Sequence, residues 1–129
     1  MNTAKISVKP NSKLAQDVVI GAHRLTADEK PPEGEDLGPE PFEWILASLG
    51  NCTAFTLRLY AKRKSWPLTD VKVECDGSRS DDGKLTITRR IHLEGPLDAE
   101  QTKRLMEIAD RCPVHRALSQ PTAINTSAA

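Results

Sequence analysis

The stretch from Phe42 to Lys64 constrains the fold more than any other part of the sequence, because it predicts a long helix with almost no polar face. Between Trp44 and Leu57 its residues are apolar or small on nearly every side, apart from Asn51 and three hydroxyl side chains. Prolines and acidic residues at its start and basic residues at its end suit the two termini of a helix. A helix that is apolar all round is buried. We therefore expect this helix at the centre of the fold.

The remaining elements are predicted by alternating residues and by turn signals. Alternation of apolar and polar residues predicts strands at 4–9, in two parts of 13–29 that turn around Gly21, at 71–77, at 84–95 and in the tail at 121–128. Residues 78–83 form a hairpin turn between two of these strands. Residues 30–41, rich in proline, glycine and acidic side chains, form a long loop.

A second helix follows the last long strand. Asp98 and Gln101 form a capping box, and the apolar residues behind it are spaced for one helix face: Leu105, Ile108, Ala109 and Cys112. Pro113 leaves two interpretations of Cys112, which either ends this helix or caps a further one. The order of strands, long helix, hairpin, helix and strand predicts an α+β fold with a mostly antiparallel sheet and helices on one side. We expect a single domain over residues 1–129.

Composition narrows the classes of function. The 18 basic and 18 acidic residues cancel, and aromatic residues make up only 4% of the chain, so neither a basic surface nor stacking platforms point to nucleic acid. No apolar stretch is long enough to span a membrane, and residues 1–10 lack the apolar core of a signal peptide. The three cysteines have no CxxC spacing and no companion histidine cluster, so no metal is expected. These features predict a cytoplasmic protein.

Cysteine chemistry is the remaining signal. Cys52 lies in the apolar helix, where it is either a small core residue or a reactive thiol; Gly50 and Asn51 beside it are poor helix-core residues and indicate a close approach to the backbone. Cys112 is either the last apolar residue of its helix or, as an N-cap, a stabilised thiolate. Cys75 continues the buried alternation of its strand, so we interpret it as a core residue.

Two long segments resemble the family of osmotically inducible protein C and the organic hydroperoxide resistance proteins. They are GPEPFEWILASLGNCTAFTLRLYAKRKSWPL (38–68) and, later in the chain, DRCPVHRAL (110–118). The similarity extends over nearly the whole chain in order and includes the turn LEGPLDAEQ (93–101). It is strongest for the branch of OsmC-like proteins with a CPVH motif at the second cysteine.

The resemblance implies both an assembly and a reaction. It implies an intertwined homodimer, in which two central helices pack between two sheets and the active sites are shared. It also implies a peroxidase without metal, haem or flavin, in which Cys52 attacks a hydroperoxide and becomes a sulfenic acid. Cys112 would then form a disulfide with Cys52, which an external thiol or dithiol reduces. The activating residues of the family correspond to Arg24 and Glu43.

Helix geometry adds a condition to the role of Glu43. It lies nine residues before Cys52, which in a regular helix is ~13 Å of rise and about half a rotation. Glu43 therefore reaches a Cys52 thiol only from the partner subunit or through a break in the helix. Three interpretations are compatible with these features. The first is a peroxidase for organic hydroperoxides, with hydrogen peroxide as a poorer substrate, in oxidative stress defence. The second is a non-enzymatic module that binds a small ligand or senses redox state, and the third is a structural dimer whose cysteines are only core residues.

Overall fold

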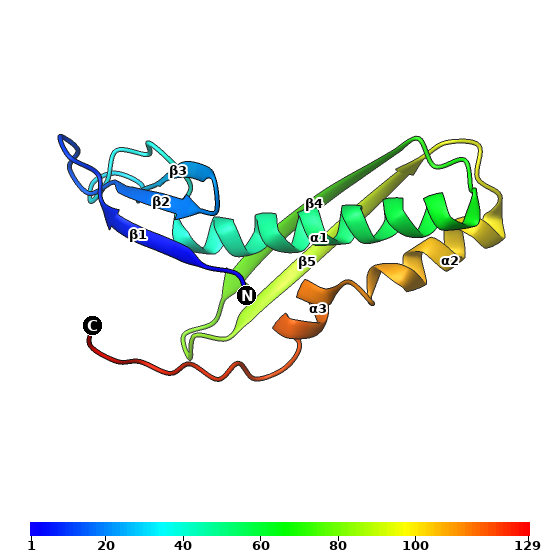
Figure 1. The fold of residues 1–129 in the computed structure, drawn as a ribbon. Coiled ribbons are helices and arrows are strands. Elements are labelled where there is room, and N and C mark those ends of the chain that lie inside the picture. The colour runs from blue at the N-terminus through cyan, green and yellow to red at the C-terminus, as the bar shows by residue number, and fades with distance from the viewer. The chain divides into compact units, whose positions relative to one another are not determined.

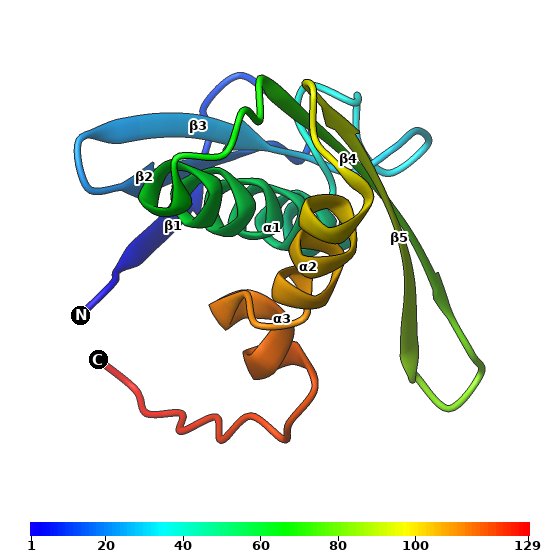
Figure 2. The same ribbon diagram turned by 90° about the vertical axis from the view of Figure 1, so that its right-hand side faces the viewer.

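The computed structural model describes all residues from 1 to 129 (Figures 1 and 2). Its elements are β1 (Ala4–Val8), β2 (Gln16–Ile20), β3 (His23–Ala27), α1 (Pro41–Lys64), β4 (Asp70–Arg79), β5 (Leu85–Glu94), α2 (Ala99–Ala109) and α3 (Pro113–Leu118). Every strand pair is antiparallel, which confirms the predicted α+β class. The chain forms two compact units, Met1–Ile45 and Leu46–Ala129, which are described in turn.

The first unit contains a three-stranded sheet in the order β1–β2–β3. The last two strands are joined by a tight turn at Gly21 and Ala22, where Gly21 has a φ of +59° that favours glycine. Val18 of β2 is buried, whereas Ile6 and Val8 of β1 are exposed. The two strands predicted within 13–29 and the turn at Gly21 are thus confirmed.

Asp28 organises the loop that follows this sheet. It is buried, and its carboxylate accepts hydrogen bonds from the backbone N–H groups of Glu29, Glu35 and Leu37 at 2.8–3.1 Å. Burial by itself raises the pKa of Asp28, but the three N–H donors together lower the pKa by a larger amount. The pKa of Asp28 therefore lies below its usual value. The loop therefore folds around one carboxylate, which stays ionised at neutral pH.

Gly34 is the tightest position of this loop. A Cβ atom there would overlap the carbonyl oxygen of Glu29 and approach the carboxylate of Asp28. We expect Gly34→Ala to open the loop and to increase the rate of thermolysin cleavage before Leu37 at least about tenfold, because such cleavage follows the population of locally opened chain. The exposed neighbour Glu33→Ala is the matched control; equal cleavage of both variants would contradict the expectation.

The second unit is built on the β4–β5 hairpin, whose register runs from Asp70 opposite Glu94 to Arg79 opposite Leu85. One face of the hairpin is partly buried, and both views show α1 and α2 on the same side of it (Figures 1 and 2). The core between them is formed by buried residues of the two helices: Leu57, Ala61, Leu105, Ile108 and Ala109. Side chains from the hairpin, including Val71, Ile91 and Leu93, pack against this core.

The observed helices agree with the sequence predictions, whereas the strand predicted in the C-terminal tail is absent. Asp98 is the N-cap of α2 and forms the predicted capping box with Gln101. The strand predicted at 121–128 is wrong, because residues 121–129 have no regular secondary structure. Ile124, the large apolar residue of this tail, is 82% exposed, so the segment has no buried face to hold it on a sheet. None of the helices is long and apolar enough to cross a membrane.

Candidate active site

Cys52 and Cys112 lie together in the second unit. Cys52 is half-buried in the middle of α1, and Cys112 is fully buried at the N-cap of α3. The two thiols are close enough for Cys112 to affect the pKa of Cys52. Two consecutive backbone N–H groups at the start of α3 donate hydrogen bonds to the two sulfurs. The Val114 N–H donates to Cys52 Sγ at 3.5 Å, and the His115 N–H donates to Cys112 Sγ at 3.3 Å. One helical turn therefore holds the two sulfur atoms.

Pro113 explains this arrangement locally. A proline disfavours helical geometry in the preceding residue, and Cys112 accordingly has an extended backbone with φ −60° and ψ 135°. Pro113 itself occupies the first position of α3, where no N–H is needed. The structure thus selects the second interpretation of Cys112: α2 ends at Ala109, and Cys112 caps the next helix.

The surroundings of Cys52 act on its pKa in opposite directions. Burial raises the pKa of the thiol, and the adjacent Cys112 thiol raises it as well. The Val114 N–H and the Thr56 hydroxyl lower the pKa, because they bond to the thiolate form. The raising effects are larger, and the pKa of Cys52 lies above its ordinary value. Within one protomer, Cys52 is therefore held mainly as the thiol at neutral pH.

Arg89 is a functional candidate that sequence reasoning missed. It projects from β5 at an inward-facing position, and its side chain is only 12% exposed. Its Nη1 donates to Thr53 Oγ1 at 3.1 Å and to the Ala109 carbonyl at 3.4 Å, and its Nη2 donates to Asp110 Oδ1 at 2.9 Å. A guanidinium with three protein partners therefore lies beside the segment that leads to Cys112.

Thr53, the neighbour of Cys52, was also missed. Its side chain is fully buried, and its Oγ1 lies 2.7 Å from the Leu49 carbonyl and 3.9 Å from Cys112 Sγ. Because a threonine hydroxyl has one proton, it can serve only one of these two acceptors at a time. Thr53 is thus the polar connection between Arg89 and Cys112.

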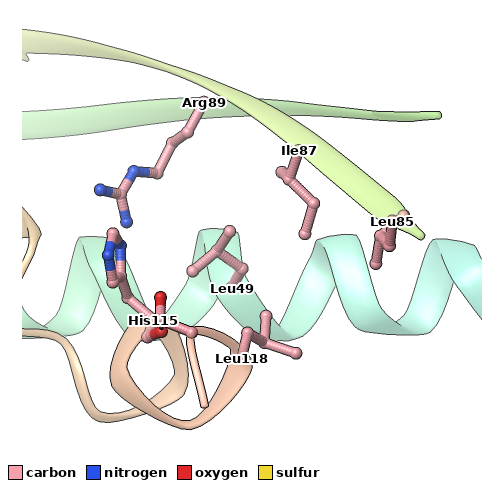
Figure 3. A pocket seen from close by; sticks show the side chains of 7 residues that line it. Leu49, Leu85, Ile87, Arg89, His115 and Leu118 are labelled. Atoms are coloured by element: carbon pink, nitrogen blue, oxygen red, sulfur yellow. Dashed lines mark hydrogen bonds between the residues drawn. The ribbon is translucent and has the colours of Figure 1, made fainter. Parts of the chain in front are cut away.

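A hollow of about 390 Å³ adjoins this site (Figure 3). Its lining is mixed: the apolar residues are Leu49, Leu85, Ile87 and Leu118, and the polar ones are Arg89, His115 and Ser119. In Figure 3 the Arg89 side chain extends from β5 toward the ring of His115, while Leu49, Ile87 and Leu118 form the apolar side. His115 Nδ1 also lies 3.9 Å from Asp110 Oδ1. The hollow therefore combines apolar walls with one cationic end.

Arg24 and Glu43, the predicted activating residues, belong to the first unit. Arg24 is exposed on β3 opposite Val19. Glu43 is in the first turn of α1, where its carboxylate accepts a hydrogen bond from the Glu40 N–H at 3.0 Å and lies 3.5 Å from Lys30 Nζ. Glu43 thus helps to cap its own helix. The assignment of both residues to Cys52 activation stays a prediction.

Cys75 is partly buried on the inward face of β4, in agreement with its interpretation as a core residue. Burial raises the pKa of the Cys75 thiol, and Asp76 raises it further, whereas Arg89, which lies opposite Cys75 in the hairpin register, lowers it. Because burial dominates, the pKa of Cys75 lies above its ordinary value. No three side chains of histidine, cysteine, aspartate or glutamate gather in a way that would hold a metal ion.

The raised pKa of Cys75 predicts slow reaction with iodoacetamide. Only the thiolate reacts, so alkylation is expected to be slower than that of a cysteine in the urea-unfolded chain at neutral pH, and to keep rising about tenfold per pH unit beyond pH ~8.5. Mass spectrometry of peptic peptides after labelling at pH 6.5–10 measures this rate. A plateau below pH 8 would contradict the expectation.

Comparison with known proteins identifies the fold. The OsmC-like protein from Mycoplasma pneumoniae is 22% identical, with 91% of this chain and 87% of that chain covered and a TM-score of 0.75. The organic hydroperoxide resistance protein OsmC of Legionella pneumophila is 21% identical, with 92% and 88% covered and a TM-score of 0.69. OhrB of Bacillus subtilis, an organic hydroperoxide resistance protein, is 18% identical, with 89% of each chain covered and a TM-score of 0.59. No curated protein sequence matches this chain.

The sequence model described as OsmC-like protein matches residues 34–127. This segment contains all of α1 and the hairpin, as well as both cysteines that meet at the start of α3. The solved structures, at their low identity, establish the shared fold alone. The sequence match extends over most of the chain, and the chain therefore belongs to the family of OsmC-like proteins.

Proposed function

We propose that this protein is a thiol-dependent peroxidase that reduces organic hydroperoxides, and hydrogen peroxide less well, in oxidative stress defence. The observation that carries the proposal is that consecutive N–H groups of α3 donate to the two sulfurs, Val114 to Cys52 Sγ at 3.5 Å and His115 to Cys112 Sγ at 3.3 Å. A half-buried thiol beside a fully buried one matches the requirements for a peroxide-attacking and a resolving cysteine. Three free cysteines and a cycle that consumes thiols support a location in the reducing cytoplasm.

The proposed cycle uses only these thiols and an external reductant. The Cys52 thiolate attacks the outer oxygen of the hydroperoxide, the O–O bond breaks, and the alkoxide leaves and takes up a proton to become the alcohol. Cys52 is now a sulfenic acid, oxidised by two electrons. The Cys112 thiolate attacks the Cys52 sulfur, an S–S bond forms, the S–O bond breaks, and hydroxide leaves as water after protonation. A dithiol then returns both cysteines to the reduced state.

The hollow beside the site supports an organic substrate. Leu49 and Ile87 line its walls, and Leu49 lies on α1 one turn before Cys52. An alkyl or aryl tail gains free energy when it leaves water for such walls, and hydrogen peroxide has no tail to place there. This difference is the physical basis for the proposed preference.

Activation of Cys52 is proposed to need a second subunit. Burial keeps its pKa high within one protomer, and α1 is helical without interruption from Pro41 to Lys64, which turns Glu43 and Cys52 of one chain to opposite sides. Phe55 and Leu59, which are 56% and 59% exposed, continue the helix stripe that contains Cys52. We propose that a homodimer covers this stripe and that Glu43 and Arg24 of one subunit act on the thiol of the other.

The assembly can be tested on that stripe. We expect the wild type to be a dimer by light scattering coupled to size exclusion, and Phe55→Asp to be monomeric, because a buried carboxylate has no partner there. Arg58→Asp, three residues further along α1, is the control for an added acidic charge. A monomeric wild type at tens of micromolar would overturn the shared-site part of the proposal.

Intact mass measurement tests the reaction itself. The reduced protein is mixed with one equivalent of cumene hydroperoxide, and the products are weighed after acid quench. The expected product has lost two hydrogen atoms, and neither Cys52→Ser nor Cys112→Ser forms it. Cys112→Ser is expected to gain one oxygen instead. An unchanged wild-type mass after complete mixing would refute the peroxidase.

The raised pKa of Cys52 also favours a second candidate, a redox-sensing or ligand-binding protein without useful turnover. In that case the Cys52–Cys112 disulfide would form with stoichiometric oxidant, but hydroperoxide consumption with excess dithiol would stay near the uncatalysed rate. Steady-state consumption of cumene hydroperoxide therefore separates the two functions.

A further inference from the structure

Arg89 is a cation whose side chain is only 12% exposed, at a position where the strand pattern calls for an apolar residue. The inward-facing residues around it on β5 are Ile87 and Ile91. Burying a guanidinium is costly unless its N–H groups are paired. The pairing found here is distributed over two other elements: Thr53 on α1, and Ala109 and Asp110 at the end of α2. Arg89 therefore joins β5, α1 and the segment that carries Cys112.

The partners of Arg89 flank the two reactive sulfurs. Thr53 directly follows Cys52, and Asp110 lies two residues before Cys112. The Asp110 carboxylate is 71% exposed, so solvent screens its contribution, whereas the contacts of Arg89 with Thr53 and Ala109 are on the inner side. The guanidinium thus fixes the distance between the Cys112 segment and α1 from inside.

Thr53 also gives Arg89 an electrostatic route to Cys112. The Thr53 oxygen accepts from Arg89, which polarises its O–H and makes it a stronger donor. That proton faces either the Leu49 carbonyl at 2.7 Å or Cys112 Sγ at 3.9 Å. When Cys112 becomes a thiolate, its negative charge favours rotation of the hydroxyl toward the sulfur.

We propose that Arg89 is a positioning residue for the resolving step: it holds the Cys112 segment against α1 and, through Thr53, stabilises the Cys112 thiolate that attacks the oxidised Cys52. This inference rests on the proposed peroxidase cycle and assigns a role within it. The attack itself is the condensation given above, in which the S–S bond forms and water is released.

The test compares Arg89→Met with Arg90→Met. Arg90 is the next residue of β5, is 52% exposed and pairs with Glu74 and Asp76, so its variant removes the same charge from the opposite face. After one equivalent of cumene hydroperoxide, rapid-quench mass measurement with dimedone gives the lifetime of the Cys52 sulfenic acid. We expect Arg89→Met to form the disulfide at least about tenfold more slowly, as for loss of a hydrogen bond to a charged group. Arg90→Met is expected to match the wild type.

Three further variants separate positioning from folding. Arg89→Lys, which keeps the charge but not the planar fork, is expected to recover part of the rate. Thr53→Val removes the hydroxyl at nearly constant shape and is expected to slow disulfide formation, whereas Thr53→Ser is expected to stay near the wild type. If Arg89→Met does not fold, the Thr53 pair still decides: equal rates for the valine and serine variants would overturn the electrostatic route.

The pH dependence of the rate of disulfide formation distinguishes the proposed role from a purely structural one, which would leave this dependence unchanged. The titratable and charged groups around Cys112 are Cys52 on α1, Cys75 on β4, Arg89 on β5, Asp110 after α2 and His115 on α3. The proposed stabilisation of the Cys112 thiolate is lost in Arg89→Met, so disulfide formation in this variant is expected to need a higher pH. An identical pH profile and rate in wild type and Arg89→Met would overturn the proposal.

A peroxide-independent measurement separates this inference from the peroxidase. Diamide oxidises a dithiol to a disulfide and is itself reduced to the hydrazine, so it reports on the approach of the two sulfurs without a hydroperoxide. One informative result is that diamide oxidises Arg89→Met slowly while the wild type does not react with cumene hydroperoxide. That result would support the positioning role and refute the peroxidase. Diamide oxidation of Arg89→Met at the wild-type rate would refute the positioning role alone.

Discussion

Cys52→Ser is expected to reduce the steady-state consumption of cumene hydroperoxide at least about a thousandfold, the scale of loss when a nucleophile is removed. A serine hydroxyl in this half-buried position has no base that could ionise it, because its neighbours are the Val114 N–H, the Thr56 hydroxyl and the Cys112 thiol. Peroxide consumption is followed by a ferrous xylenol orange assay with excess dithiol.

The control is Cys75→Ser, which removes a thiol from β4 and leaves the interacting pair intact. It is expected to retain turnover within about twofold, because serine is close to cysteine in shape and the N–H groups that bond to Cys52 and Cys112 are unchanged. Cys112→Ser is expected to react once and then to turn over slowly, because Cys52 has lost its partner. If Cys52→Ser consumes hydroperoxide as fast as the wild type, another group is the nucleophile.

The sequence predicted the positions of the two thiols because each sits in a strong local pattern. The apolar helix around Cys52 leaves it in the interior, and the proline after Cys112 determines the backbone there. Local patterns also predicted α1, the hairpin and the capping box of Asp98. What they could not decide was whether Cys112 ended one helix or began another, since both are compatible with one apolar residue before a proline.

Arg89 and Thr53 show why the rest of the site could not be predicted from the sequence. Their hydrogen bond joins residues 36 positions apart, and the Thr53–Cys112 contact joins residues 59 apart. The first is created by the packing of β5 against α1, and the second by the packing of the start of α3 against α1. One local signal did exist: the inward positions of β5 read Leu85, Ile87, Arg89, Ile91 and Leu93. A lone charge in such an apolar alternation marks a buried cation, and buried cations gather partners.

Glu43 illustrates the opposite case. Its acidic side chain before an apolar helix was assigned a chemical role through family resemblance, and the structure gives it a local one at the cap with Glu40. A carboxylate at a helix N-terminus is stabilised there whatever the chemistry of the site. The two roles are separable by experiment, since capping lies within one subunit and thiol activation requires two.

Leu105→Ala is the substitution with the largest expected effect on stability. Leu105 is fully buried on α2 and belongs to the core with Leu57 and Ile108. Removing three carbon atoms there is expected to lower the free energy of unfolding by about 2–5 kcal/mol, the sum of lost transfer energy and the cavity left behind. Met106→Ala is the matched control, because Met106 is 44% exposed on the next helix position, and its cost is expected to stay within about 0.5 kcal/mol.

The measurement has to report on the second unit by itself. Trp66 packs against this core, whereas Trp44 belongs to the first unit, so urea unfolding is followed by tryptophan fluorescence in a Trp44→Phe background. Because α2 ends with Ala109 and Asp110, which Arg89 holds, loosening of α2 should also slow formation of the Cys52–Cys112 disulfide. A Leu105→Ala variant as stable as Met106→Ala would show that this core does not hold α2. In that case the alignment of the two sulfurs would depend on α3 and Arg89 alone.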